Sequence, residues 1–220
     1  MKTFFALSLV AVTAWSHAET PATTFTVFGG DKPTGKAYCK LAPTPEGGRR
    51  FVMTLILRLG GRDLQIRSES TYDSTGLALS RRQETGKPGK PADDIVDVTF
   101  GIDKALVKET KGGQLTTKEV AIDAKLPRAD ALMKWTPNRF PSPGSELALY
   151  SFDMAKHTFN LAKAIYEGVD SLALDGKKVA AHRIVTESRG NRYEIWVDDN
   201  GMPYRMSLGT FRLDRVMSGA

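Results

Sequence analysis

The feature that most constrains the fold of this chain is a period-two alternation of apolar and polar residues, repeated between short turns. The alternation is clear at 64–72, 95–100 and 192–197. Successive side chains of a β-strand point to opposite faces of a sheet. The pattern therefore indicates strands that place one face against a core and the other in water.

Turn residues interrupt this alternation about every ten residues. They are glycine pairs or Asp-Gly and Asn-Gly type sequences, at 29–30, 47–48, 60–61, 73–76, 112–113, 175–176, 189–191 and 200–201. Such pairs accept the positive φ angles of tight hairpins. Strands joined by hairpins form an antiparallel meander, so we expect a mostly β protein.

The expected strands lie at 23–29, 36–42, 50–59, 62–72, 77–84, 93–101, 104–110, 114–122, 146–153, 158–168, 171–174, 177–187, 191–198, 203–208 and 211–216. The segment 154–167 admits two interpretations. Asp153 could cap a helix through Ala155 and Leu161 that ends at Gly168. The alternation from Phe159 to Ile165 instead favours a strand.

The stretch 50–59 is apolar on both of its faces. Phe51, Met53, Leu55, Leu57 and Leu59 share one face, and Val52 and Ile56 lie on the other. A strand of this kind is covered on both sides. The expected cover is the irregular stretch 123–145, with Trp135 and Phe140 as its large side chains and one helical turn at 130–135, because prolines stop a longer helix.

The N-terminus has the form of a secretory signal peptide. Lys2 precedes an apolar run from Phe4 to Trp15, and small residues at 16 and 18 allow cleavage after Ala18. The run is shorter than the about 20 residues of a membrane-spanning helix. We expect an exported chain, periplasmic or secreted, with one mature domain at 19–220 and no transmembrane segment.

Charge and cysteine content narrow the classes of partner. The net charge is +6. A modest positive excess outside the cytoplasm favours anionic partners such as lipid head groups, acidic glycans or cell-wall polymers. The basic residues are scattered along the sequence, which argues against nucleic acid as a partner.

Cys39 is the single cysteine, and its place in an alternating stretch predicts burial.

Candidate catalytic and metal-binding residues are few. The mature chain holds only His157 and His182, neither at the spacing of a zinc site, and it contains no Gly-x-Ser-x-Gly elbow or glycine-rich phosphate loop. We therefore assign no catalytic residue, metal or cofactor. The sequence Asp198-Asp199-Asn200-Gly201 lacks the spacing of a calcium loop and predicts a hairpin turn.

Residues 145–206 carry a resemblance to a known group of proteins. It rests on Glu167-Gly168-Val169-Asp170, Asp175-Gly176, Ala181, Arg183, Val185, Trp196-Val197-Asp198, Gly201 and Arg205. This stretch resembles exported bacterial β-meander domains of unknown function, similar in plan to the half-barrel of the lipoprotein carriers LolA and LolB. The resemblance implies a curved sheet with an apolar concave face, a covering loop or short helix, and a strand before Glu167.

These observations predict a non-enzymatic protein that binds a lipid, acyl chain or other amphiphile on the concave face of a β half-barrel. The expected contact residues are Met53, Leu55, Leu57, Trp135, Phe140, Tyr150, Phe152 and Trp196. Two alternatives remain open. One is a structural or scaffolding module that docks an envelope protein, and the other is a hydrolase of envelope polymers that uses His157 or His182 beside a carboxylate.

Overall fold

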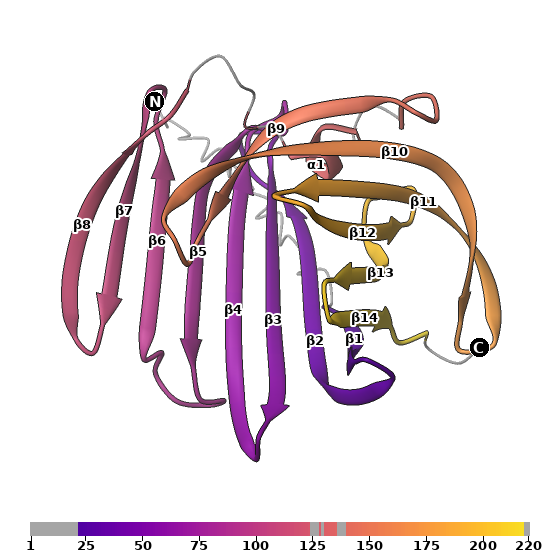
Figure 1. Cartoon of the computed structure of the whole chain (residues 1–220), viewed down its shortest axis with the longest axis horizontal. Helices are drawn as coiled ribbons and strands as arrows, with labels where there is room; N and C mark the ends of the chain where they lie inside the picture. Colours follow the sequence, from indigo (N-terminus) through magenta and orange to yellow (C-terminus); the bar gives the residue numbers. More distant parts are fainter. Residues whose placement is uncertain (1–21, 124–127, 129, 136–139, 218–220) are drawn as a thin grey trace, which may run out of the picture.

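The computed structural model describes residues 22–123, 128, 130–135 and 140–217. The predicted signal peptide at 1–18 lies outside these residues. The described chain forms one 14-stranded antiparallel sheet and a short helix (Figure 1). The strands are β1 (Thr23–Gly29), β2 (Lys32–Pro43), β3 (Arg49–Leu59), β4 (Arg62–Tyr72), β5 (Ala78–Gly86), β6 (Asp94–Phe100), β7 (Lys104–Lys111), β8 (Gln114–Ala121), β9 (Glu146–Asp153), β10 (Thr158–Leu174), β11 (Lys177–Ser188), β12 (Asn191–Val197), β13 (Pro203–Leu208) and β14 (Phe211–Arg215). The helix is α1 (Ala131–Trp135). The predicted antiparallel meander is confirmed.

The first and last strands lie together in the middle of the sheet. The strand order is β8-β7-β6-β5-β4-β3-β2-β1-β14-β13-β12-β11-β10-β9. The chain runs outward from β1 to one edge, crosses to the opposite edge, and returns to the middle through β14. The pairing of β1 with β14, from Phe25 opposite Arg215 to Gly29 opposite Phe211, is the contact that makes two meanders one sheet.

The ambiguous segment before Glu167 is a strand, and the two strands expected at 158–168 and 171–174 are one. β10 continues through a bulge next to Gly168, whose φ of 102° suits glycine. The cap signal at Asp153 serves a hairpin turn instead. Its carboxylate accepts the N–H groups of Ala155 and Lys156, and the chain then reverses at His157.

The sheet is open, because β8 and β9 are its two unpaired edges. It is nevertheless rolled, so that side chains of β9 and β10 contact side chains of β6. Strands β9 to β12 run across the direction of β2 to β8 (Figure 1). Phe152 of β9 and Phe159 of β10 contact Phe100 of β6, with ring centroids 5.7 and 6.0 Å apart. Val98 and Val107 belong to the same buried cluster. The strong curvature expected of the half-barrel is therefore confirmed.

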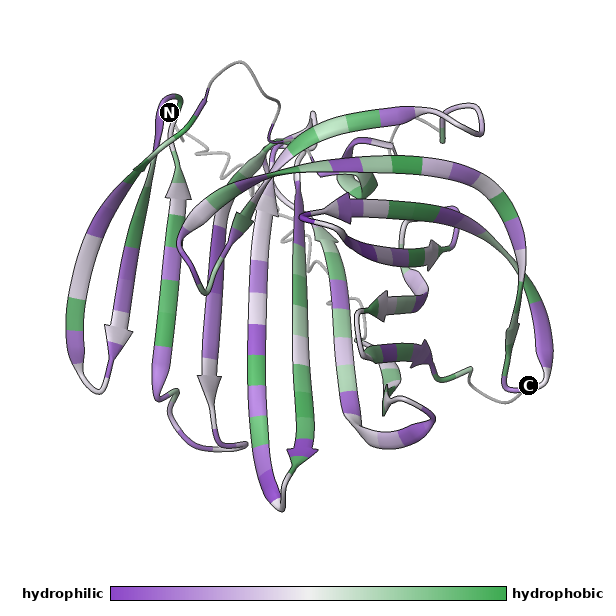
Figure 2. Cartoon of the chain, in the orientation of Figure 1, coloured by the Kyte–Doolittle hydropathy of each residue, from purple (hydrophilic) through white to green (hydrophobic). Residues whose placement is uncertain are grey.

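The two faces of the sheet differ in chemistry, and the bands of green and purple along the strands in Figure 2 follow this alternation. The inner face carries the buried side chains Phe25, Val27 and Leu213. The outer face carries ion pairs between neighbouring strands, such as Arg82 with Asp97 at 2.7 Å. Val52 and Ile56, the second apolar face of 50–59, lie half-buried among long polar cross-strand neighbours: Lys36, Lys40, Gln65 and Glu69.

Helix α1 packs inside the rolled sheet and contacts both of its halves. Trp135 belongs to the cluster of β9, β10 and β11, and Met133 packs with Tyr72 and Ala78 of the other half. Asp130 caps the helix by accepting the N–H groups of Leu132 and Met133. The predicted helical turn within 123–145 is thus present and covers the concave side.

Cys39 is fully buried on the inner face, as its alternating surroundings predict. Burial raises the pKa of its thiol from 9.0 to about 12. The native thiol is therefore expected to resist a water-soluble disulfide reagent at pH 8 and to react only after unfolding. A rapid reaction in the absence of denaturant would contradict this burial.

The same shift sets an expected pH dependence. Below pH 9 the thiol is protonated in both the folded and unfolded states. Between pH 9 and about 12 only the unfolded state releases the proton, so the free energy of unfolding falls as the pH rises. Urea titrations should show this fall to be weaker in Cys39→Ala, by up to about 1.4 kcal/mol per pH unit.

Candidate functional site

The structure distributes the eight predicted contact residues over several places. Met53, Leu55 and Leu57 form one apolar stripe on the inner face of β3. Trp135 and Phe140 pack around Tyr166, Phe152 lies against Phe100, and Tyr150 packs on Phe159. Trp196 lies on the outer face, with the Arg183 guanidinium 5.3 Å from its ring. Only the β3 stripe offers a continuous apolar surface of several predicted residues.

His182 is held in a chain of hydrogen bonds on the inner face. Its Nδ1 lies 2.8 Å from the Tyr166 hydroxyl, and its Nε2 lies 2.9 Å from an Asp199 carboxylate oxygen. Phe140 stacks on the imidazole with ring centroids 3.7 Å apart. Burial raises the pKa of the Tyr166 phenol, which favours its neutral, hydrogen-bonding form. The arrangement ties β10, β11 and the β12–β13 turn together.

This chain of bonds differs from the arrangement of a serine or cysteine hydrolase. Such an enzyme needs a hydroxyl or thiol nucleophile on the imidazole and access for substrate. Here Tyr166 occupies that position and is 4% exposed. His157 faces Glu109 at 4.0 Å. Within the described ranges, no group of three or more His, Cys, Asp or Glu residues could hold a metal ion.

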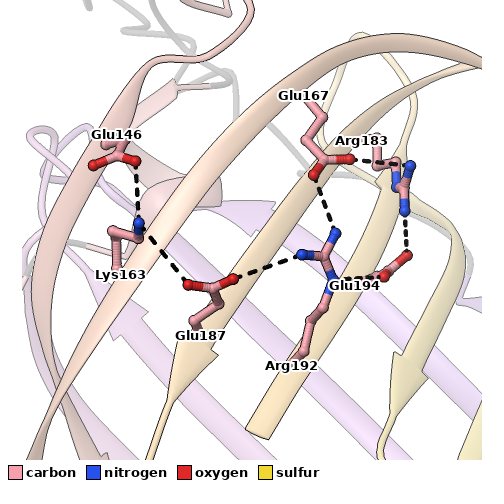
Figure 3. Close-up of polar contacts among 7 residues, drawn as sticks. All are labelled: Glu146, Lys163, Glu167, Arg183, Glu187, Arg192 and Glu194. Carbon is pink, nitrogen blue, oxygen red and sulfur yellow. Dashed lines mark hydrogen bonds and ion pairs between the residues drawn. The ribbon is translucent and has the colours of Figure 1, made fainter. Parts of the chain in front are cut away.

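The outer face of β9 to β12 carries a network of ion pairs drawn in Figure 3. Lys163 contacts Glu146 at 3.1 Å, and Arg183 contacts Glu194 at 2.8 Å. The network continues through Glu167, Glu187 and Arg192. Its aliphatic stems cover Val185, which lies on the same face and is fully buried. Each charged group in Figure 3 has a neighbour of opposite charge within the network, so none of these charges is left unpaired for a ligand.

A groove at the C-terminal end of β3 has the size and lining of a binding site. We call it the rim groove; its volume is about 830 Å³, within the range of small-molecule sites. It is lined by Leu59, Arg62, Asp63, Leu64, Gly86, Lys87, Pro88, Lys90 and Asp93. Leu64 pairs with Leu57, and Leu59 is the last residue of β3. Leu59 and Leu64 therefore lie on the same face as Leu57, whereas Met53, Leu55 and Leu57 pack in the core and do not line the groove.

A tight turn forms the second wall of the rim groove. The Lys90 N–H donates to the Lys87 carbonyl at 3.1 Å, and Gly89 has φ 70°. Pro88 and Gly89 thus occupy the central positions of a type II turn, where proline and glycine are favoured. The first and last Cα atoms of such a turn lie less than about 7 Å apart, so Lys87 and Lys90 are close neighbours.

The groove combines an apolar wall with an excess of positive charge. Arg62, Lys87 and Lys90 are exposed and make no ion pair with any residue in the described part of the chain. Of the two carboxylates in the lining, Asp63 faces Arg58 at 3.7 Å. None of these cations is among the predicted contact residues, which are all apolar or aromatic. The symmetric Lys-Pro-Gly-Lys sequence was the available signal.

The fold of this chain is similar to that of a solved protein, whereas its sequence matches no known family. No family model and no curated protein matches the sequence. The structure is similar to the crystal structure of a "Beta-barrel-like Protein of Domain of Unknown Function DUF1849 from Brucella abortus". The TM-score is 0.57 at 11% identity, and the match covers 89% of this chain and 94% of that chain.

This likeness shows the fold and agrees with the predicted resemblance to bacterial β-meander domains of unknown function. At 11% identity it transfers no residue role. Within the described residues, the single short helix is far from the length and apolarity needed to cross a bilayer.

Proposed function

We propose that this protein is exported and binds a single-chain amphiphile with an anionic head group in the rim groove. The acyl chain lies along Leu59 and Leu64, and the head group lies on Arg62, Lys87 and Lys90. The observation that carries the proposal is that these three cations, beside an apolar wall, have no ion-pair partner among the described residues. The export address at 1–18 and the half-barrel plan of LolA and LolB belong to the same proposal, since both suit a lipid of the cell envelope.

The energetics of the groove favour this class of ligand. Burial of apolar surface contributes about 0.8 kcal/mol for each methylene group. Exposed ion pairs contribute about 0.2–1 kcal/mol each. The acyl chain therefore provides most of the affinity, and the three cations select among head groups. Short anions without a chain are expected to bind weakly.

Head-group selectivity gives the direct test. Lysophosphatidylglycerol is expected to bind more tightly than lysophosphatidylcholine with the same chain, when each is titrated below its micelle concentration. Each added methylene should raise the affinity about fourfold. The triple variant Arg62→Gln, Lys87→Gln, Lys90→Gln should weaken binding of the anionic lipid about tenfold.

A matched control separates local from net charge. The triple variant Lys108→Gln, Lys111→Gln, Lys118→Gln removes the same charge from β7 and β8 and should bind like the wild type. Isothermal titration calorimetry provides the affinities. Equal binding of the two lipids, or equal loss in both triple variants, would overturn the assignment of the head group to the rim groove.

A further inference from the structure

A second hollow lies on the inner face of the C-terminal half, at the ends of β9 to β13. We call it the polar pocket; its volume is about 420 Å³. Asn160 of β10 lies opposite Ser151 of β9, and Thr186 of β11 lies opposite Tyr193 of β12. Thr186 also pairs with the buried Ala164, so this face is the inner one. The lining of this hollow shares no residue with the rim groove.

Five side chains of the polar pocket are neutral and lack a hydrogen-bond partner among the residues that the structure describes. Ser151, Asn160, Thr186, Asn191 and Tyr193 make no side-chain hydrogen bond to any residue that the structure describes. The Asn160 side-chain oxygen is also inaccessible to solvent. A buried polar atom without a partner is unfavourable, so a ligand or water must satisfy it. The volume of the polar pocket is many times larger than the volume of about 30 Å³ that one water molecule occupies in the liquid.

The polar pocket has three charged residues in its lining: Asp153, Lys156 and Arg189. Arg189 faces Asp153 at 3.7 Å and donates to the Thr158 hydroxyl at 3.4 Å. Lys156 is the remaining charged residue of the lining. The Ser188 hydroxyl donates to the Leu161 carbonyl, and the lining further offers the hydroxyls of Ser151 and Thr186, two asparagine amides, and the ring and hydroxyl of Tyr193. Such groups donate and accept hydrogen bonds with neutral partners and supply one apolar ring face.

We propose that the polar pocket binds a neutral saccharide unit. The hydroxyl groups of the sugar bond to Asn160, Thr186 and Ser151, and its C–H face packs on the Tyr193 ring. Asn160 supplies both a donor and an acceptor, which suits adjacent sugar hydroxyls. Neutral hydrogen-bonding groups around a small apolar surface fix orientation and provide specificity in such sites. This site acts independently of the rim groove.

The test uses the full mature chain and three uncharged tetrasaccharides: chitotetraose, cellotetraose and maltotetraose. Amide NMR spectra are recorded during each titration. We expect at least one probe to bind with a dissociation constant of about 1 mM or tighter. The side-chain amide signals of Asn160 and Asn191 should shift in the wild type, a readout that requires no variant.

Variants then locate the site. Asn160→Leu and Tyr193→Ala should each weaken binding at least about tenfold. Asn200→Leu, in the exposed β12–β13 turn, should leave it unchanged. The Lys87 and Lys90 variants should also have no effect. Absence of saturation with all three probes up to about 10 mM, shifts confined to another surface, or full binding by a folded Asn160→Leu would each overturn the proposal.

Discussion

Replacement of Phe25 by alanine is expected to lower the free energy of unfolding by about 3–5 kcal/mol. Phe25 is fully buried in β1, the strand that joins the two meanders. Its cluster includes Leu57 from the N-terminal meander and Met206 and Leu213 from the C-terminal one. Loss of the ring therefore leaves a cavity between the N-terminal and C-terminal meanders. Neither meander can move to fill the cavity without disturbing its packing on the other. Urea denaturation followed by circular dichroism measures the effect.

The control for this prediction lies one position away on the strand. Thr24 is half-buried, and alternation places it on the other face of β1. Thr24→Ala should change the free energy of unfolding by less than about 1 kcal/mol. Similar small effects of both substitutions would mean that β1 does not lie at the centre of the core.

Replacement of Leu64 by aspartate is expected to weaken binding of an anionic lysolipid by at least about a hundredfold. The change removes apolar surface from the wall of the rim groove and places a carboxylate at the proposed position of the acyl chain. A charge against an apolar chain is strongly unfavourable. It also introduces repulsion toward the anionic head group. The dissociation constant of lysophosphatidylglycerol, measured by calorimetry, reports the loss.

Leu115→Asp is the matched control for this substitution. Leu115 lies in β8 and is 65% exposed, so the same change of chemistry occurs away from the groove. Its affinity should equal that of the wild type. Thermal unfolding of both variants separates loss of the site from loss of the fold. Undiminished binding by a folded Leu64→Asp protein would remove Leu64 from the proposed site.

Local features of this fold were predictable from sequence, and the long-range ones were not. Alternation and turn residues predict the hairpins, because adjacent strands joined by tight turns must pair. The same alternation cannot specify which distant strands meet. The pairing of β1 with β14 depends on packing of Phe25 and Val27 with Leu213, which only the assembled core determines.

Trp196 carries a signal in the sequence that the predicted contact residues do not use. Tyr193, Ile195 and Val197 alternate with Trp196, so the sequence itself placed Trp196 on the opposite face from the apolar set. Trp196 is predicted to contact a ligand on the concave face because it is a large aromatic residue. In the structure it lies beside Arg183 on the outer face. The apolar stripe of β3 lies on the inner face, and its role in binding stays a prediction. Of the cations in the rim groove, Lys87 and Lys90 come from a loop distant in sequence, and Arg62 begins β4.

Photo-cross-linking locates the surface of this protein that an acyl chain contacts. A fatty acid with a diazirine at the end of its chain is irradiated with the protein, and the modified peptides are identified by mass spectrometry. We expect labelling of the two segments that form the rim groove, at 57–66 and 86–93, with competition by unlabelled lysophosphatidylglycerol. Labelling confined to other segments, or labelling that the lysolipid does not compete, would contradict a binding site at the rim groove.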